Sequence, residues 1–449
     1  PMLSFALREL GCTAGVVVTA SHNPPQYNGY KVYWEDGAQI TAPKDKQIIT
    51  EVQAITDFAQ VKTMSEEDAK AAGLYEVIGD EIDDKYMEAL KKLVLRPEAI
   101  KEQADKLKIV YTPLHGTGNI PVRRVLKELG FNNVYVVKEQ ELPDGDFPTV
   151  SYPNPEDKNA FTLALKLAAE VDADIVLATD PDADRLGIYA KNEKTGEYES
   201  FTGNMSGMLI LEYLLSQRKE LGMLPENGAV VTTIVSGKMA RAIAKEYNVE
   251  LIETLTGFKY IGEQIKFFEQ NHDHEFLFGY EESYGCLEGT HARDKDAVVA
   301  VMALCEAAAY YKSKEITLCE QMQNLYQKYG FYKESLFFQT FQGMEGKAKI
   351  DGLMDALRNE PPKQVGPFKV TALEDYKKSV RTDIATGETS ALTLPESNVL
   401  YFELEDGAWF CVRPSGTEPK IKYYAGVKGA DAQDAADKLE ALSKAVVEL

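Results

Sequence analysis

The sequence Asp-Ile-Val-Leu-Ala-Thr-Asp-Pro-Asp-Ala-Asp-Arg, residues 174–185, sets the pattern for the first two-thirds of this chain. Its first half is a short apolar run bounded by polar residues, which is typical of a buried strand. Its second half is an acidic loop that contains a proline. A buried strand that ends in a polar loop is the pattern of α/β sheets, where ligand-binding loops follow the strands.

Working outward, the same pattern recurs several times. Further strand-like runs occupy residues 14–19, 108–114, 134–137, 229–235 and 275–279. Amphipathic segments lie between them, for example residues 122–129 and 160–170. This alternation predicts α/β units with largely parallel sheets.

The last third of the chain has a different pattern. Close-spaced strand candidates cover residues 399–404, 409–412 and 421–427. A segment of helical period follows, with one apolar face formed by Ala435, Leu439, Leu442, Val446 and Leu449. We therefore expect a smaller α+β domain with an antiparallel sheet.

Length and charge limit the possible functions. A chain of 449 residues is too long for one hydrophobic core, so we expect two to four domains. The polar stretches near residues 80–105 and 330–365 are the best candidates for linkers. The net charge of −22 argues against nucleic acid or an anionic membrane surface as a partner. No apolar stretch approaches the roughly 20 residues needed to span a bilayer.

The cysteines and the first residue lead to two further expectations. Five cysteines show neither a CxxC pair nor zinc-site spacing, which favours a reduced, cytoplasmic protein. No targeting segment is visible. Because the first residue is Pro1 rather than Met, we expect that the natural N-terminus is absent.

The acidic loop has the composition of a metal site. Asp180, Asp182 and Asp184 alternate in a tight loop, and their carboxylates suit a hard cation such as Mg²⁺ or Ca²⁺. A calcium-binding EF-hand loop is excluded, because Arg185 replaces the glycine and Lys191 replaces the bidentate glutamate. A solvated acidic turn is the other alternative, but three like charges this close repel one another.

A second loop, Thr19-Ala20-Ser21-His22-Asn23-Pro24, follows the first strand candidate. A serine beside a histidine at a strand end can be a positioned nucleophile. A plain turn remains open, since serine, asparagine and proline are all turn residues. The GxSxG motif of α/β-hydrolases is absent.

Two more loops carry groups that bind sugars and anions. Glu281 and Ser283, in the loop 279–285, can hydrogen-bond neighbouring sugar hydroxyls, although an ordinary polar turn fits equally well. The loop Arg413-Pro414-Ser415-Gly416-Thr417-Glu418-Pro419-Lys420 concentrates donors suited to a phosphate, with a proline-rich hairpin loop as the alternative. Together the four loops indicate metal-assisted phosphoryl transfer on a sugar phosphate.

These four loops also resemble, in order, the active-site loops of the α-D-phosphohexomutase family. The matching motifs are Thr-Ala-Ser-His-Asn-Pro, Asp-Pro-Asp-Ala-Asp-Arg, Gly-Tyr-Glu-Glu-Ser and Arg-Pro-Ser-Gly-Thr-Glu-Pro. The resemblance covers the whole chain. Within the family, residues 111–118 and 256–259 look like the phosphoglucomutase and phosphopentomutase branch.

The resemblance implies an α/β fold of four domains around a cleft. Three would be α/β domains with mixed sheets and the fourth a C-terminal α+β domain with an antiparallel sheet. We place them at residues 1–88, 89–203, 204–329 and 330–449, the last beginning with a linker. Family members carry a longer N-terminal part, so the first domain is expected to be incomplete.

The resemblance also implies a role for each site residue. Ser21 would carry the phosphoryl group and share Mg²⁺ with the three aspartates. Lys31, His22 and Arg185 would be catalytic, with Lys31 as the general acid or base. The substrate-binding residues would be Glu281, Ser283, Thr256, Gly257, Lys259, Arg293, Lys295, Arg413, Ser415, Gly416 and Thr417.

The implied reaction interconverts glucose 1-phosphate and glucose 6-phosphate through glucose 1,6-bisphosphate. Pentose, mannose and glucosamine phosphates remain alternative substrates, and a non-enzymatic sugar-phosphate sensor remains the alternative class. We expect a phosphosugar substrate as the partner, no nucleic acid or membrane, and a monomer or weak dimer.

Overall fold

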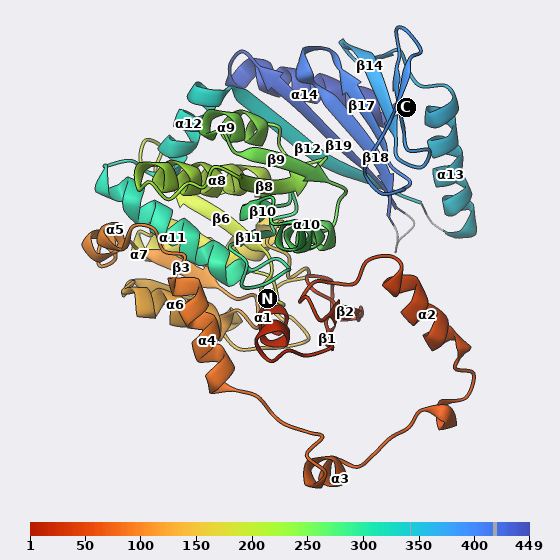
Figure 1. The fold of residues 1–449 in the computed structure, drawn as a ribbon. Coiled ribbons are helices and arrows are strands. Elements are labelled where there is room, and N and C mark those ends of the chain that lie inside the picture. The colour runs from red at the N-terminus through yellow and green to blue at the C-terminus, as the bar shows by residue number, and fades with distance from the viewer. Residues whose placement is uncertain (342, 416–419) are drawn as a thin grey trace. The chain divides into compact units, whose positions relative to one another are not determined.

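The structure is a computed structural model that describes residues 1–341, 343–415 and 420–449, with the backbone alone at residues 343–345 (Figure 1). The chain divides into two compact units. One contains residues 1–232 and 257–319, and the other contains residues 233–256 and 320–449.

Residues 174–185 lie in a mixed sheet of the first unit, whose strand order is β4-β3-β5-β6-β7. Its strands are β3 (Ile109–Thr112), β4 (Val134–Val136), β5 (Ile175–Thr179), β6 (Leu186–Lys191) and β7 (Tyr198–Phe201). β3 is parallel to β4 and β5, but β6 and β7 add antiparallel pairs. Antiparallel β6 can follow β5 directly because only the short loop 180–185 joins them.

Helices cover this sheet because its strands are apolar on both faces. Every residue of β5 is buried. The elements that accompany the sheet are α6 (Asn119–Leu129), η2 (Lys138–Gln140), η3 (Lys158–Phe161) and α7 (Thr162–Val171). Ala164 and Ala168 of α7 pack in one core with Val110 and Val176 of the sheet. The two amphipathic segments predicted from the sequence are thus confirmed as α6 and as η3 with α7.

A second group of strands in the first unit contains the sugar-binding loop candidate. β8 (Gly228–Thr233) runs parallel to β10 (Glu275–Tyr280), and β10 pairs antiparallel with β11 (Cys286–Glu288). The helices of this region are α8 (Gly203–Glu220), α10 (Phe258–Asn271) and α11 (Ala297–Ser313). α11 is buried along nearly its whole length, so it serves as a central core element of this unit.

The N-terminal segment holds the serine loop on a small hairpin. β1 (Ala14–Val18) and β2 (Tyr30–Trp34) form an antiparallel two-stranded sheet beside α1 (Met2–Glu9). The following elements are α2 (Lys44–Ala54), η1 (Phe58–Gln60) and α3 (Glu66–Ala71). None of the residues in these three elements is buried, and Phe58 is 90% exposed.

The two stretches predicted as linkers are regular structure, so that prediction was wrong. Residues 80–105 form α4 (Asp80–Lys91) and α5 (Pro97–Gln103), and α4 buries Ile82, Tyr86, Met87 and Leu90. Residues 330–365 contain β12 (Phe331–Thr340) and α13 (Gly343–Asn359). Their many charged residues face solvent, and the composition alone did not separate a charged amphipathic element from a linker.

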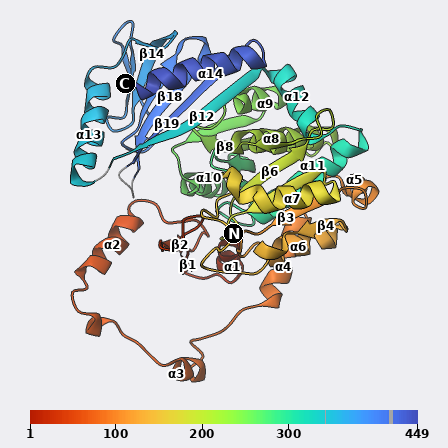
Figure 2. The same cartoon turned by 180° about the vertical axis from the view of Figure 1, so that it is seen from behind.

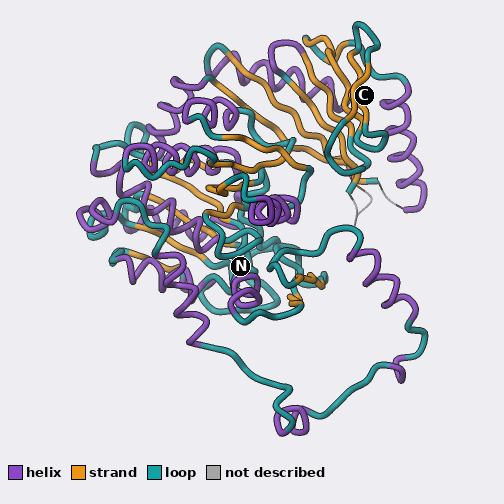
Figure 3. Tube along the Cα trace, in the orientation of Figure 1, coloured by secondary structure: helices purple, strands orange, loops and turns teal. Residues whose placement is uncertain are grey.

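The second unit contains an antiparallel sheet with the strand order β12-β19-β18-β17-β14-β15-β16. Its strands are the long orange tubes in the upper part of Figure 3. The strands after β12 are β13 (Gln364–Val365), β14 (Phe368–Asp375), β15 (Val380–Asp383), β16 (Thr389–Ala391), β17 (Leu400–Leu404), β18 (Trp409–Pro414) and β19 (Lys420–Gly429). This confirms the α+β pattern expected for the last third.

Helices complete the second unit. They are α9 (Met239–Tyr247), α12 (Leu318–Tyr329), α13 and α14 (Ala432–Val447). The first two residues of α12 still belong to the first unit. β9 (Glu250–Thr254) and η4 (Glu405–Gly407) are further elements of the second unit. α14 packs on β12 and β19 (Figure 2). The predicted apolar face is buried at Ala435, Leu439, Leu442 and Val446, and Leu449 lies beyond the helix end. Among the described residues, no helix combines the length and apolar character that a membrane crossing requires.

A buried carboxyl in the first unit makes stability depend on pH. Glu288, on β11, is 2% exposed, and its Oε1 has no hydrogen-bond partner among the described residues. Burial raises the pKa of Glu288 to about 8; Arg218 opposes this increase and Glu306 adds to it. The folded state therefore keeps a proton that the unfolded state releases near pH 4.5.

We expect this carboxyl to destabilise the fold progressively as the pH rises from about 4.5 to 8. Between pH 6 and pH 8 its contribution to the free energy of unfolding should fall by about 2 kcal/mol. Glu288→Gln, which resembles the neutral acid, should remove that part of the pH dependence. Urea unfolding of both proteins at the two pH values measures it, with exposed Glu226→Gln as the control. Equal pH dependence in wild type and Glu288→Gln would contradict the assignment.

Candidate active site

Ser21 follows β1 in a backbone conformation that is unfavourable for serine. Its φ is 53°, in the left-handed region, and its N–H donates to Thr19 Oγ1 over 2.8 Å. Non-glycine residues in this region are often found at functional sites, where the surrounding structure maintains the strain. The turn alternative for this loop is therefore correct as local geometry, and the turn presents the Ser21 side chain.

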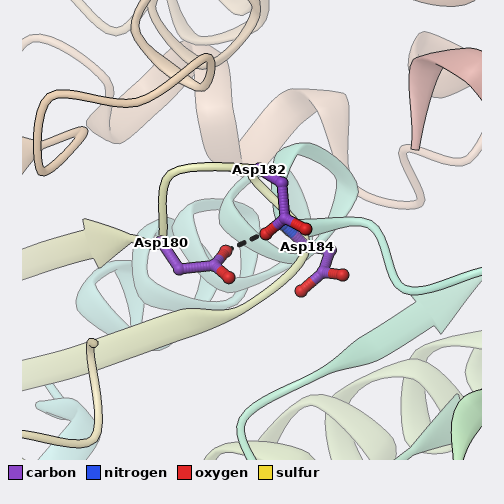
Figure 4. Close-up of side chains that lie close together, drawn as sticks. All are labelled: Asp180, Asp182 and Asp184. Carbon is purple, nitrogen blue, oxygen red and sulfur yellow. Dashed lines mark hydrogen bonds between the residues drawn. The ribbon is translucent and has the colours of Figure 1, made fainter. Parts of the chain in front are cut away.

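The three aspartates lie in the tight loop between β5 and β6 (Figure 4). Asp180 closes this loop, because its Oδ1 accepts the N–H groups of Asp184 and Arg185, each over 3.0 Å. Ala183 adopts a φ of 56°, which allows the chain to turn sharply. The alternating side chains therefore converge, and one oxygen from each lies within 4.8 Å of the others.

The serine and the acidic loop meet although they are distant in sequence. Ser21 Oγ lies 3.1 Å from Asp180 Oδ2 and 3.1 Å from Asp182 Oδ1. His22 Nδ1 lies 3.2 Å from Ser21 Oγ as well. One hydroxyl proton can serve only one acceptor at a time, so Ser21 Oγ faces more acceptors than it has protons.

The crowded carboxylates change the protonation of the site. The pKa of Asp180 is raised well above its ordinary value by burial and by Asp182. The pKa of Asp182 is lowered, because hydrogen bonding from Asp180 and the charge of Lys31 outweigh its burial. Asp180 and Asp182 thus form the hydrogen bond drawn in Figure 4, with the proton on Asp180.

Two lysines balance the remaining negative charge. Lys31 Nζ, from β2, lies 2.9 Å from Asp182 Oδ2 and 3.4 Å from Asp184 Oδ2. Lys295 Nζ lies 3.2 Å from Asp184 Oδ2. Burial lowers the pKa of Lys31, but Asp184 and Asp182 together raise it above its ordinary value. Both lysines are therefore ammonium groups at neutral pH.

His22 and Arg185 complete the surroundings of the serine. Burial and the charge of Arg185 lower the pKa of His22 to about 3, so its imidazole is neutral at physiological pH. Arg185 is held by Glu156, whose Oε1 lies 2.8 Å from Nη1. Its buried Nε has no hydrogen-bond partner among the described residues. This Nε lies 3.8 Å from Asp184 Oδ1, within ion-pair range but too far for a hydrogen bond. A buried guanidinium N–H without a hydrogen bond is well suited to an anionic ligand.

The loop after β10 lies against the acidic loop. Leu186 N donates to Tyr284 O over 3.0 Å, and Arg185 forms a β-bridge with Gly285. Glu281 is 7% exposed and accepts the N–H of Gly257 over 3.0 Å. Burial raises the pKa of Glu281 to about 7, although Lys295 opposes the increase.

The acidic loop has the ligands for a divalent cation. All of its candidate ligands are carboxylate oxygens, which hard cations such as Mg²⁺ prefer. Asp184 Oδ1 is buried without a hydrogen-bond partner among the described residues, as an oxygen reserved for a ligand would be. A cation would also replace the proton held between Asp180 and Asp182. These residues therefore fit a bound metal ion.

Arg413, in the second unit, is held in place by two side chains. Its Nη1 donates to Thr256 Oγ1, and its Nη2 lies 3.4 Å from Tyr424 Oη. Its buried Nε has no hydrogen-bond partner among the residues that the structure describes. Ser415 N donates to Lys420 O over 2.8 Å. The predicted ligands Gly416 and Thr417 lie outside the described residues.

The structure also places three further residues that were predicted to bind substrate. The guanidinium of Arg293 is fully buried and donates to Glu269 and to the carbonyls of Thr290 and Ala292, so its position does not support a binding role. Lys259 lies in the first turn of α10, with Nζ over the Tyr260 ring. Ser283 is half-buried in the β10–β11 loop.

Sequence reasoning missed several residues that support this site. Tyr33 and Gln39 donate to Asp294, which also binds Lys295. Glu156 fixes Arg185 from a loop without periodic pattern. Of these, only Tyr33 could have been predicted from the sequence. It lies two residues after Lys31 in a strand, so both side chains lie on the same face.

Family models match four consecutive parts of the chain. Residues 1–58, 84–195 and 202–329 match the α/β/α domains I, II and III of phosphoglucomutase/phosphomannomutase, and residues 358–442 match its C-terminal domain. A protein named phosphoglucomutase from Staphylococcus epidermidis RP62A is 39% identical over 429 residues, which are 95% of this chain and 76% of that protein. The chain belongs to the phosphoglucomutase/phosphomannomutase family. The resemblance and the four-domain α/β architecture predicted from the sequence are thereby confirmed.

Other members of the family are similar over comparable lengths. A protein named phosphoglucomutase from Staphylococcus aureus MRSA252 is 38% identical over 443 residues, 98% of this chain and 77% of that protein. Two solved structures share the fold. Pp63/parafusin from Paramecium has a TM-score of 0.67 at 18% identity, covering 99% of this chain and 79% of its own. A phosphoglucomutase/phosphomannomutase family protein from Burkholderia thailandensis has a TM-score of 0.64 at 18% identity. The match covers 97% of this chain and 76% of that protein.

Proposed function

We propose that this chain is a phosphoglucomutase, an isomerase that interconverts glucose 1-phosphate and glucose 6-phosphate through phosphorylated Ser21. The contact of Ser21 Oγ with Asp180 and Asp182 carries the proposal, because it places a nucleophile against an oxygen-rich cation site. Relatives that are 37–39% identical over nearly the whole chain and are named phosphoglucomutase support the same conclusion.

We propose Mg²⁺ as the metal, held by Asp180, Asp182, Asp184 and the phosphorylated Ser21. Bound there, it would neutralise charge on the phosphoryl oxygens during transfer. The residues around it have separate tasks. Arg185 would offer a phosphoryl oxygen its Nε–H, which has no hydrogen-bond partner among the described residues. Lys31 and Lys295 balance the carboxylate charge, so an anionic group can enter an otherwise acidic site.

The reaction consists of two transfers. In the first, the bond between phosphorus and Ser21 Oγ breaks, and a bond forms from phosphorus to O6 of glucose 1-phosphate. This gives glucose 1,6-bisphosphate; the O6 hydroxyl gives up its proton, and the released Ser21 Oγ takes one up to become a hydroxyl. In the second transfer, the phosphorus at position 1 bonds to Ser21 Oγ, its bond to O1 breaks, and O1 receives a proton. Glucose 6-phosphate then leaves.

Proton transfer requires groups near Ser21 in the correct protonation state. His22 is neutral, and its Nδ1 lies 3.2 Å from Ser21 Oγ, so it can accept a hydrogen bond from the serine hydroxyl and orient it. With a pKa of about 3 it is too weak a base to hold the serine proton. Lys31 is an ammonium and can donate a proton, which matches the acid half of the role expected for it. We assign Lys31 as the general acid and retain His22 as the catalytic neighbour.

Between the transfers the bisphosphate must exchange its two ends. Glu281 and Ser283 would hold hydroxyls 3 and 4 of the ring, since a carboxylate accepts and a hydroxyl both donates and accepts. Arg413, Ser415, Gly416 and Thr417 would bind the phosphate that is not transferred. Thr256, which accepts from Arg413, would assist them together with Gly257 and Lys259 of the same segment. We expect the enzyme to work in the cytoplasm as a monomer or weak dimer.

The decisive test is transfer of label to the serine. The full-length protein is incubated with Mg²⁺ and with glucose 1,6-bisphosphate that carries radioactive phosphate, and the labelled peptide is identified by mass spectrometry. A phosphoglucomutase takes label on Ser21 and passes it to glucose 1-phosphate. A sugar-phosphate sensor binds the bisphosphate and takes no label, and this result would overturn the proposal.

Sugar choice gives a separate prediction. Glucose and mannose share hydroxyls 3 and 4, so the Glu281 and Ser283 contacts cannot reject mannose. We expect only about a 10- to 100-fold preference in kcat/KM for glucose 1-phosphate over mannose 1-phosphate, and a larger one over ribose 1-phosphate. Glu281→Gln should lower kcat/KM for both hexoses together, by about 10- to 100-fold, because both lose a bond to a charged acceptor.

A panel of the four sugar 1-phosphates (glucose, mannose, ribose and N-acetylglucosamine) measures this preference. Half-buried Glu282→Gln, one residue along the same loop, controls for a general change in charge. If ribose 1-phosphate had the higher kcat/KM, the chain would be a phosphopentomutase.

A further inference from the structure

Asp294 lies in the loop between β11 and α11 and is 3% exposed. Four donors converge on its carboxylate. Tyr33 Oη donates to Oδ2 over 2.6 Å and Gln39 Nε2 to the same oxygen over 2.7 Å. The N–H of Lys295 donates to Oδ1 over 2.9 Å, and Lys295 Nζ lies 3.2 Å from it. Asp294 therefore links the β1–β2 hairpin to the loop that carries Lys295.

The hairpin end of this link leads to the other lysine of the site. Tyr33 and Lys31 are two residues apart on β2, so their side chains point to the same face. The hairpin has only two strands, and little of it is buried. It needs an external anchor to hold Lys31 at the acidic loop, and the Tyr33–Asp294 bond supplies one close to that lysine.

We propose that Asp294 is a positioning residue that sets both lysines at the phosphoryl-transfer site. It holds Lys295 directly, and it holds Lys31 through Tyr33. The inference rests on the proposed function, because it assigns Asp294 to the transfer step at Ser21. Asp294 itself touches none of Ser21, Asp180 or Asp182 through any hydrogen bond of the described residues, so its effect on the reaction passes through the lysines.

The geometry explains why this residue is a carboxylate. Two oxygens, each with two donors directed at it, use the full accepting capacity of an ionised aspartate. In Asp294→Asn one of the two oxygens becomes an NH₂ group, which would face donors instead of accepting from them. Either the Tyr33 and Gln39 pair or the Lys295 pair then loses its acceptor.

The chain supplies a matched control two residues further on. Tyr86 donates to the buried Asp296 over 2.8 and 2.9 Å, as Tyr33 does to Asp294. Asp296 caps α11 through the N–H groups of Val298 and Val299 and binds His291. Tyr86→Phe therefore removes the same kind of bond from the same loop but leaves both lysines of the site untouched.

The test measures single-turnover phosphorylation of Ser21 by labelled glucose 1,6-bisphosphate in the full-length protein. Tyr33→Phe should slow the transfer about tenfold, which corresponds to one hydrogen bond to a carboxylate, with the Kd for the bisphosphate changed less than about threefold. Tyr86→Phe should stay within about twofold of wild type although its melting temperature falls at least as far. Asp294→Asn and the double variant with Tyr33→Phe should be equally slow, because they break one network.

Equal slowing in Tyr33→Phe and Tyr86→Phe would show a purely structural role and overturn the inference. A crystal structure of Tyr33→Phe gives a readout without turnover. Displacement of Lys31 Nζ from Asp182 and Asp184 supports the positioning role, and an unmoved Lys31 overturns it. Failure of the wild-type protein to label Ser21 would instead reject the proposed function, so the two failures are distinguishable.

Discussion

The Ser21→Ala variant should lose interconversion of glucose 1-phosphate and glucose 6-phosphate by a factor on the order of 10⁴ or more, because the phosphoryl carrier is absent. Alanine is the appropriate replacement, since it keeps a Cβ at the φ of 53° and so leaves the loop strain unchanged. Ser21 is half-buried, and within the described part of the chain its hydroxyl forms hydrogen bonds only with His22, Asp180 and Asp182. The fold should therefore persist.

Phosphorus NMR of the sugar phosphates follows the turnover, and calorimetry follows the fold. Ser216→Ala is the matched control, because its hydroxyl donates to the carbonyl of Tyr213 and accepts from Gln217 Nε2, both within α8 and away from the site. Turnover in Ser21→Ala at the wild-type rate would remove Ser21 as the carrier. A fall in turnover that accompanied unfolding would be uninformative, and the calorimetric measurement distinguishes that case.

The second large effect concerns the metal site. Asp180→Asn should lower Mg²⁺ affinity by about 100-fold or more, because it removes one anionic ligand from an oxygen-only set. The folded, metal-free protein should be almost unaffected. Asparagine can still accept the N–H groups of Asp184 and Arg185, and its NH₂ group can take the place of the proton that Asp180 shares with Asp182.

Titration calorimetry with MgCl₂ measures the affinity, and thermal unfolding in EDTA measures the metal-free stability. Asp172→Asn changes the net charge equally at the exposed end of α7, and asparagine accepts its left-handed backbone. Treatment with EDTA should also stop labelling of Ser21. Unchanged Mg²⁺ affinity in Asp180→Asn, or full labelling without metal, would show that the acidic loop is not the metal site.

The sequence alone identified the elements on which the site depends. The strands before the serine, the aspartates and Glu281 were predicted because a short apolar run bounded by polar residues is a local pattern. The three aspartates could be grouped because they alternate within one tight loop. The helical face of α14 was predicted for the same reason, since period and burial are fixed by neighbours in the chain.

Charged stretches were harder to interpret from composition. Residues 80–105 and 330–365 looked like linkers, yet α4 buries Tyr86 and Leu90, and β12 pairs along its whole length with β19. A few apolar residues at helical or strand spacing outweigh many charges, because only the buried face must be apolar.

The tertiary structure decided which of the candidate residues work together. Ser21 and Asp180 are 159 residues apart, and no local pattern places them 3.1 Å from each other. Arg293 and Lys295 looked equivalent in the sequence, but Arg293 is bound to Glu269 whereas Lys295 reaches Asp184. The sequence by itself determined the chemistry of each loop, because residue type and spacing are local. The tertiary structure alone determined the partners, the protonation of Asp180 and the anchor at Asp294, because these depend on burial and on contacts between distant segments.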